Sequence, residues 1–465
     1  MQDLAIRAEW TIVHDGDRHL PARDIYVQIR DGVIVALTDR PPPVSRVIEV
    51  PGGIAHPGFI NLHNHTINAP LFRGIVDDLP RSAIGESKVY SMLMPMGGMA
   101  VTGLDADSLR DLVALGLLEV LRSGVTTLLD QFRPRQRATL ELARDWGLRL
   151  YAAPYLFSPA PVIGDAQVAR AAAGSFEGDS GLAAFEELYA EFDEGSGGMI
   201  RVILGPHAAD SCGPDLLQRV DRIARERDLL VTIHLAQSQG EVDRVKERHG
   251  CLPAEYMASV GLLREGVIFG HGVHLEEQEL AQVTAAGATI AHCPTVFLRG
   301  GKAPHYARFA RHGVRLGIGT DAERMDFYAQ LRASGFASKQ ATGESRAATA
   351  ADLFAAATTG GADALRRPDL GRISVGARAD IVIVDAFKPH MQPINDPLRT
   401  LVWYASASDI HTVVIDGQVV IDAGRTPAID RDSVIRRGAT ATSHVWQLAR
   451  EAGCFPAEAD PLTLN

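Results

Sequence analysis

The chain has 465 residues, 46% of them hydrophobic, and a formal net charge of -11, a composition typical of a globular protein with a large core. An acidic surface repels phosphate groups, so we expect neither nucleic acid nor a membrane surface as a partner. The sequence shows no basic leader followed by an apolar stretch, and no apolar run of about 18 residues. These features predict a cytoplasmic protein without membrane spans.

Residues 1–57 have the pattern of short strands. Turn signals at Asp15-Gly16 and Asp31-Gly32 separate alternating apolar runs, which favours β-hairpins. Over residues 58–371, short β-branched runs alternate with longer helical patterns, as in DSLRDLVALGLLEVLRSG followed by VTTLLD. About eight such units favour a closed (β/α)8 barrel of the TIM type over an open sheet.

Strand patterns return at residues 372–430, where Asp416-Gly417 marks another hairpin. Strands at both ends of the chain predict a small β-sandwich domain built from the two termini beside the barrel. Residues 431–465 are expected to form a final helix and a tail. The predicted fold class is therefore α/β, with a barrel and a second, smaller β domain.

Five strand-like segments end in histidine or aspartate: FINLHNH, VTIH, VIFGH, TIAH and LGIGTD. The carboxyl ends of barrel strands form the rim that hosts chemistry, so we expect these side chains to converge. His63 and His65 are two apart on one strand, so both point to the same face and could hold one ion. A single strand-end histidine is usually structural, but this repeated pattern favours a metal site. Imidazole with one carboxylate suits zinc or ferrous iron.

Several motifs resemble the cytosine deaminase-like branch of the amidohydrolase superfamily: PGFINLHNH, LFRGIVDDLP, PHAADSC, GHGV, AHCP, LGIGTD and GARADIVIVD. That branch includes S-adenosylhomocysteine and methylthioadenosine deaminases, guanine-type deaminases and triazine hydrolases, and the resemblance covers nearly the whole chain. It implies one divalent metal ion, which is expected to be zinc, with iron as the alternative. It also implies an expected ligand set, which consists of His63, His65, His234 and Asp321.

The same resemblance implies further roles at the site. Asp321 would also act as the general base, and His271 in GHGV would hydrogen-bond the attacking water and the developing oxyanion. His207 in GPHAADSC would contact the substrate. Arg73 in LFRGIVDDLP matches a residue near the pocket mouth, with a surface ion pair to a neighbouring aspartate, Asp77 or Asp78, as an equal alternative.

Gln237 departs from the pattern of the family. Most deaminases of the branch read HxxE after the third ligand, and that glutamate moves a proton to a ring nitrogen. Here the segment is HLAQSQGEV, and an amide cannot deliver a proton at pH 7. Three hypotheses stay open: Gln237 only orients a substrate that needs no ring protonation, Glu241 replaces the glutamate, or the substrate is a chloro- or alkylamino-triazine or an amide.

Four other features lie outside the expected ligand set. Segment 84–100 is rich in Met and Gly and could be either a lid over the pocket or plain core packing. Asp130, at the end of a strand, is expected to be part of the scaffold. His292 and Cys293 end another strand, and the four cysteines of the chain, which lie far apart, are expected to be core residues in a reducing compartment.

The leading hypothesis is a hydrolase that deaminates an aminated N-heterocycle (a purine, pterin, pyrimidine or triazine) with a metal-activated water. The alternative is displacement of chloride or an alkylamine from a triazine, or opening of a cyclic amide. A non-catalytic barrel scaffold is a remote third hypothesis. Such proteins usually lose the residues that bind the metal, whereas this chain has the full expected ligand set. The expected partners are a small heterocyclic substrate and further copies of the chain, in a homodimer or a larger homo-oligomer.

Overall fold

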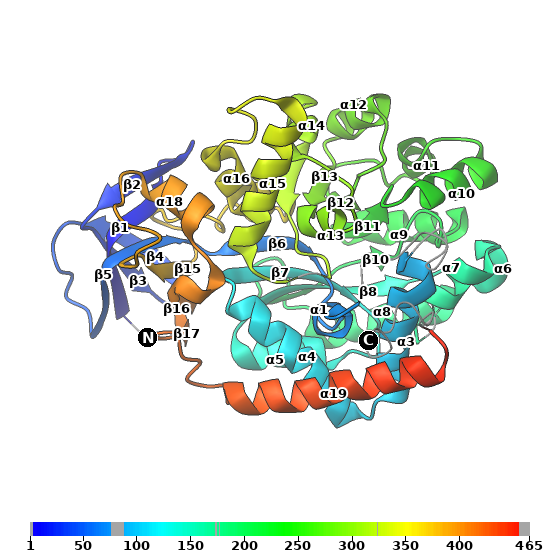
Figure 1. The fold of residues 1–465 in the computed structure, drawn as a ribbon, viewed down its shortest axis with the longest axis horizontal. Coiled ribbons are helices and arrows are strands. Elements are labelled where there is room, and N and C mark those ends of the chain that lie inside the picture. Colours follow the sequence, from blue (N-terminus) through cyan, green and yellow to red (C-terminus); the bar gives the residue numbers. More distant parts are fainter. Residues whose placement is uncertain (1–2, 76–87, 173, 176, 323, 455–465) are drawn as a thin grey trace, which may run out of the picture.

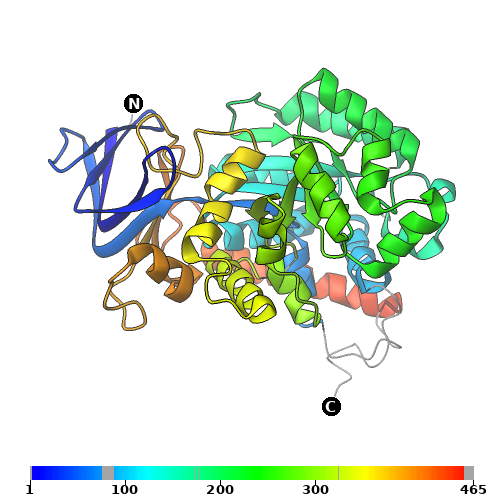
Figure 2. The same cartoon turned by 90° about the horizontal axis from the view of Figure 1, so that it is seen from above.

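The computed structural model describes residues 3–75, 88–172, 174–175, 177–322 and 324–454. Within these residues the strands form two sheets, one of nine strands and one of eight. We call the larger one the barrel sheet and the smaller one the terminal sheet. Figures 1 and 2 both show the terminal sheet at one end of the molecule, with helices surrounding the barrel sheet.

The barrel sheet has parallel pairing throughout, in the order β10-β8-β7-β6-β14-β13-β12-β11, with β9 beside β8. Its strands are β6 (Phe59–Asn64), β7 (Val125–Phe132), β8 (Arg149–Leu156), β9 (Ile200–Val202), β10 (Gly205–Pro206), β11 (Val231–Leu235), β12 (Val267–His271), β13 (Thr289–His292) and β14 (Arg315–Ile318). Parallel bridges join Leu204 to Val231 and Ala208 to His234, so the two ends of the sheet meet.

Helices connect the barrel strands, which is why the strands can run parallel. They are α1 (Asn68–Phe72), η1 (Val89–Leu93), α3 (Met94–Gly103), α4 (Ala106–Leu121), α5 (Ala138–Trp146), α6 (Ala160–Ile163), α7 (Ala166–Ala171), α8 (Gly178–Phe192), α9 (Pro214–Glu226), α10 (Gln239–His249), α11 (Pro253–Ser259), α12 (Glu277–Ala286), α13 (Pro294–Arg299), α14 (Tyr306–Arg311), α15 (Phe327–Thr342), α16 (Ala350–Ala357) and α17 (Thr359–Ala364). Every residue of β7 and β8 is buried, as expected for strands covered on both faces.

The terminal sheet combines both ends of the chain, in the order β17-β16-β15-β5-β1-β3-β4, with β2 beside β1. Its strands are β1 (Asp3–His14), β2 (His19–Arg23), β3 (Tyr26–Arg30), β4 (Val33–Thr38), β5 (Arg46–Pro57), β15 (Ile381–Asp385), β16 (Ile410–Ile415) and β17 (Gln418–Ile421). Asp31 and Gly32 have φ of 49° and 76°, the positive values that a tight two-residue hairpin turn requires. The predicted fold class, a barrel with a small β domain formed from both termini, is confirmed.

The two sheets are joined directly through Gly58, between β5 and β6. A Cβ atom at this position would lie 2.1 Å from Thr126 Oγ1 in β7, so only glycine lets the chain pass so close. The short connection fixes β6 and therefore the histidines at its end. Two short helices, α18 (Pro397–Tyr404) and η2 (Ala407–Asp409), lie between β15 and β16. After β17 comes α19 (Arg431–Glu451), which packs along α4 and α3 (Figure 1). None of the helices in the described part of the chain is long and apolar enough to cross a membrane.

Candidate metal centre

The carboxyl ends of the barrel strands bring the expected ligand set together. His63 lies near the end of β6, His65 follows it, and His234 lies in β11. One ring nitrogen from each of these three buried histidines lies within 4.8 Å of the other two. Asp321 follows β14, and its carboxylate Oδ1 lies 3.5 Å from His65 Nε2. Residues that are far apart in the sequence therefore share one small volume.

The hydrogen bonds of His65 and His234 determine which ring nitrogens carry protons. Nδ1 of His65 lies 2.9 Å from the carbonyl oxygen of Gln131, and Nδ1 of His234 lies 2.5 Å from that of His207. A carbonyl oxygen can only accept, so both Nδ1 atoms are donors and both Nε2 atoms carry a bare lone pair. These two Nε2 atoms lie 3.2 Å apart.

Two facing lone pairs at this distance need a cation between them. Burial lowers the pKa of His65 to about 4 and that of His234 to about 3, so neither ring carries a second proton at neutral pH. Two nitrogens that each lie about 2.0–2.1 Å from zinc in tetrahedral geometry are about 3.3 Å apart. The observed spacing therefore fits a zinc ion shared by the two imidazoles.

His63 supports the same conclusion independently. Its ring is fully buried, yet neither Nδ1 nor Nε2 has a hydrogen-bond partner among the residues that the structure describes. Its ring centroid lies 4.9 Å from that of His65 and 4.8 Å from that of His234. A buried polar atom without a partner costs about 1–3 kcal/mol, so this ring suits a metal ligand better than a core residue.

Asp321 occupies a constrained position between two histidines. Its Oδ2 lies 3.7 Å from Nε2 of His271, whereas its other oxygen makes the contact with His65. Its φ is 56°, in the left-handed region, and its amide donates to the carbonyl oxygen of His63 at 2.9 Å. Such strain costs on the order of 1–3 kcal/mol and is typical of functional sites. Burial raises the pKa of Asp321 to about 7.

Asp130 supports the end of β6 rather than facing the site. Its Oδ1 accepts hydrogen bonds from Asn64 Nδ2 at 2.7 Å and from the amide of Thr66 at 2.8 Å. Asn64 Oδ1 in turn accepts from Thr320 Oγ1 at 2.9 Å, which links β6 to the turn after β14. This network agrees with the scaffold role expected for Asp130, because it fixes the segments that carry His65 and Asp321.

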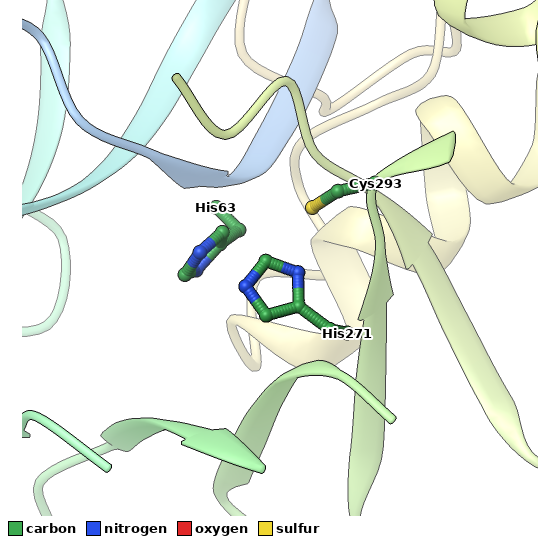
Figure 3. A group of neighbouring side chains, drawn as sticks. All are labelled: His63, His271 and Cys293. Carbon is green, nitrogen blue, oxygen red and sulfur yellow. The ribbon is translucent and has the colours of Figure 1, made fainter. Parts of the chain in front are cut away.

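Figure 3 shows His271 between His63 and Cys293, with one ring nitrogen turned toward each of them. A nitrogen of each histidine and Cys293 Sγ lie within 4.8 Å of one another, which makes a second group of possible ligands. Burial, together with the charge of Asp321, raises the pKa of the Cys293 thiol well above its usual range. Because the thiolate is the form that binds metals, this chemistry favours the group that contains His65 and His234.

A cavity of about 1270 Å³ opens over these side chains. Its lining combines several side chains of the site with apolar and charged residues of the rim: His65, Asn68, Phe72, Ile75, Lys88, Val89, Leu93, Met94, Tyr155, Asp165, His207, His234, Gln237, Ser238, Gln239, Gly240, Asp243, Arg244, Glu247, His271, His274, Val296, Phe297, Arg299, Gly300, Lys302, Asp321 and Ala322. Pockets that bind small molecules usually measure about 300–1,000 Å³, so this cavity has room for a ring with a sizeable substituent.

Gln237 and Glu241 occupy different environments. Gln237 lines the cavity, and its buried Nε2 has no hydrogen-bond partner in the described part of the chain. Glu241 is fully buried, and its two oxygens accept hydrogen bonds from the amides of Ala236 and Gln237, each at 2.8 Å. The Glu241 carboxylate thus holds the turn that presents Gln237, and it is not part of the cavity lining among the described residues.

The other expected substrate contacts differ in their placement. His207 lines the cavity, stacked on Phe157 at a centroid distance of 4.6 Å. Arg73 lies outside the described lining and forms an ion pair with Glu119, with half of its side chain exposed. The structure therefore does not bring Arg73 to the cavity, and its two alternative partners, Asp77 and Asp78, lie outside the described residues.

The Met-rich segment contributes to both the core and the cavity. Val89, Leu93 and Met94 line the cavity, whereas Met92 and Met96 are buried in the core. Residues 84–87 lie outside the described part of the chain.

Comparisons with known proteins agree with this geometry. The model of the amidohydrolase family matches residues 54–420. The chain belongs to the amidohydrolase family. The resemblance inferred from the motifs is thereby confirmed at the level of the superfamily.

This amidohydrolase is 31% identical over 401 residues to a 5-methylthioadenosine/S-adenosylhomocysteine deaminase of Desulforudis audaxviator. The matched residues cover 84% of this chain and 87% of the relative. A protein of the same name from Thermococcus kodakarensis is 31% identical over 381 residues, covering 81% and 84% of the two chains. Among solved structures, an atrazine chlorohydrolase of Arthrobacter aurescens complexed with zinc superposes with a TM-score of 0.84 at 25% identity, covering 94% of this chain and 100% of that chain. An adenosine deaminase of Xanthomonas campestris with bound zinc has the same fold, with a TM-score of 0.84 at 23% identity, covering 96% and 99%.

Tyr155 is a cavity residue of the amidohydrolase that the sequence analysis missed. It is the penultimate residue of β8, and its hydroxyl lies 3.0 Å from His65 Nδ1. Its place at the end of a barrel strand was the available signal, but only histidine and aspartate at strand ends were taken as candidates.

The raised pKa of Asp321 predicts how metal affinity depends on pH. Below about pH 7 the metal-free carboxyl holds a proton that zinc must displace, so the apparent affinity should rise about tenfold per pH unit and then level off. His65 and His234, with pKa values of about 4 and 3, add no proton in this range. Zinc titration against a competing chelator from pH 5 to 8 measures this profile. The Asp321→Asn variant has no such proton, so its zinc affinity should change little with pH over this range. If its affinity rose with pH as steeply as that of wild type, another group would hold the proton.

Proposed function

We propose that the protein is a zinc-dependent hydrolase that deaminates an aminated N-heterocycle and releases ammonia. The two bare Nε2 atoms of His65 and His234, 3.2 Å apart below a large cavity, carry this proposal. His63 and Asp321 complete the ligand set. The zinc in the related chlorohydrolase and the names of the deaminase relatives support both the metal and the reaction.

The chain supplies the proton transfers of the proposed reaction. Zinc bound at this site would lower the pKa of a water molecule and polarise the carbon under attack. Asp321 lies where it can accept the proton of the attacking water, because its two carboxylate oxygens lie beside His65 and His271 at the proposed site. The same carboxyl group then protonates the leaving amine, which departs as ammonia.

His271 provides the electrostatic part of the reaction. Its Nε2 lies 3.7 Å from Asp321 Oδ2, at the edge of the same volume. A donor at this place stabilises the charge that develops on the attacking oxygen, an effect worth on the order of 3 kcal/mol. His271 also has a φ of 80°, a positive value that is uncommon for residues other than glycine.

Gln237 orients the substrate in this proposal and does not protonate it. Its unpartnered Nε2 can donate a hydrogen bond to a ring atom, whereas proton delivery would require a carboxylic acid. Since Glu241 is occupied by two backbone amides, it does not replace the missing glutamate. His207, stacked on Phe157, forms part of the same wall.

A panel of aminated heterocycles, assayed for ammonia release by the zinc-loaded protein, tests the proposal. We place 5-methylthioadenosine and S-adenosylhomocysteine first, because the cavity of about 1270 Å³ suits a ring with a long substituent. Release of chloride or an alkylamine from triazines, or of a new carboxylate from cyclic amides, would favour the alternative reactions. Failure of all three product assays would contradict a hydrolase.

Gln237→Glu restores the acid that most deaminases of this branch have. On a substrate that gains from ring protonation, we expect a rise in kcat of about tenfold or more, and a new limb in the pH–rate profile. Gln239→Glu is the matched control, because it adds the same charge to the cavity wall at a neighbouring residue. Equal pH–rate profiles for wild type and Gln237→Glu would show that position 237 does not determine proton transfer.

We further propose a cytoplasmic location and a small-molecule substrate. All four cysteines are free, which suits a reducing compartment. Assembly into a homodimer or larger oligomer stays a prediction.

A further inference from the structure

Tyr155 lies on the wall of the cavity, next to the metal centre. Its ring is buried, with 2% exposed, and its hydroxyl lies 3.0 Å from Nδ1 of His65. Its ring centroid lies 5.2 Å from that of His207 and 6.4 Å from that of His234. The phenol therefore lies between a proposed metal ligand and a proposed substrate contact.

The direction of the hydrogen bond between Tyr155 and His65 follows from the partners of His65. Nδ1 already donates to the carbonyl oxygen of Gln131 at 2.9 Å, so it must carry a proton. The oxygen of Tyr155 can then only accept from that N–H group. The proton of the phenol remains unused, and no other hydrogen bond of this hydroxyl is found among the described residues.

We infer that Tyr155 is a substrate-binding residue that donates its phenolic hydrogen bond to a ring nitrogen of the heterocycle. This inference rests on the proposed function, since it needs a ring bound over the metal centre. Tyr155 lines the cavity together with His207 and Gln237, so a ring held there has this side chain within its reach.

Tyr155 donates a hydrogen bond without transferring its proton. A phenol has an ordinary pKa of about 10, so it carries its proton at neutral pH. With Gln237, whose Nε2 is also an unused donor, it forms a pair of neutral donors for ring acceptors. Such a pair would favour substrates that are recognised through ring nitrogens but need no ring protonation, which is the first hypothesis for Gln237.

The test compares wild type, Tyr155→Phe and Tyr151→Phe, all loaded with zinc. Tyr151 lies on the same strand, is buried outside the described cavity lining, and serves as the matched control. Each protein is assayed on the active member of the heterocycle panel and on analogues in which one ring nitrogen at a time is replaced by CH. Zinc content is measured for each, and we expect it to stay at one ion per chain.

For Tyr155→Phe we expect kcat/KM to fall about tenfold on the parent heterocycle, the effect of one lost hydrogen bond. On the analogue that lacks the accepting nitrogen, wild type and Tyr155→Phe should react equally fast, and Tyr151→Phe should resemble wild type on every compound. An equal loss on all analogues, or no loss on the parent, would overturn the role of Tyr155 alone. Inactivity of wild type on the whole panel would overturn the proposed function, and this inference with it.

Discussion

Asp321→Asn is expected to lower kcat/KM of the zinc-loaded enzyme by about 10³-fold, within the range of general acid–base catalysis. The variant keeps the shape of the side chain and an oxygen that can contact the ion, but it can no longer take up a proton. The carboxylate Oδ1 lies 3.5 Å from His65 Nε2, beside the proposed ion, and this position is what prepares Asp321 to take up the proton of the water. Steady-state kinetics, normalised to bound zinc, measure the loss.

Asp326→Asn is the control for this experiment. Asp326 is also buried and near in sequence, but its carboxylate caps α15 by accepting from the amide of Ala329, and asparagine can keep that cap. We expect the control to retain activity within a factor of about two to three, as for a change of a few tenths of a kcal/mol. If Asp321→Asn were as active as the control, another group would have to be the base.

His234→Ala should remove both the metal and the activity. The replacement takes away one of the two facing Nε2 atoms, and with it a bond to the ion that the remaining residues do not replace. Loss of a Lewis acid worth several kcal/mol corresponds to a fall of about 10³-fold or more in kcat/KM. Zinc content by elemental analysis and ammonia release together measure the effect.

The control is His249→Ala. His249 is the last residue of α10, and its ring stacks on Tyr256 away from the site. It should retain one zinc ion and normal turnover. Because deletion of a buried ring can also weaken the fold, thermal unfolding of metal-free wild type and His234→Ala provides the baseline. Full zinc occupancy in a folded His234→Ala variant would remove His234 from the ligand set.

The fold class was predictable because its signals are local. Asp31-Gly32 and Asp416-Gly417 mark hairpins, since both residues of each pair have positive φ in the structure. The segment DSLRDLVALGLLEVLRSG ends at the glycine before β7, and α4 covers residues 107–121 of it. The meeting of β15 with β5, which builds the terminal sheet from both chain ends, depends instead on long-range packing.

The candidate site was predictable as far as strand ends determine it. His63, His234 and Asp321 converge because parallel strands end at one rim. His292 also ends a strand but is buried beside Phe309, outside both groups of possible ligands found among the described residues. The strand-end pattern alone could not separate His292 from the ligand set, because the difference lies in which way the buried ring points.

Loop residues were less predictable for a related reason. Glu241 and Gln237 are four residues apart, and only the three-dimensional turn shows that the carboxylate binds backbone amides while the amide faces the cavity. Arg73 matched a family motif but pairs with Glu119. Tyr155 carries no metal-binding group, so its place beside His65 became apparent only from the packing of β8 against β7.

X-ray absorption of the zinc-loaded protein tests the central claim most directly, because it reports the atoms bound to the ion. The ligand set predicts one zinc per chain, with nitrogen and oxygen neighbours at about 2.0–2.1 Å and no sulfur. A sulfur neighbour at about 2.3 Å would place the ion with Cys293, in the second group of possible ligands. That result, or a folded protein that binds no zinc, would contradict the proposed centre.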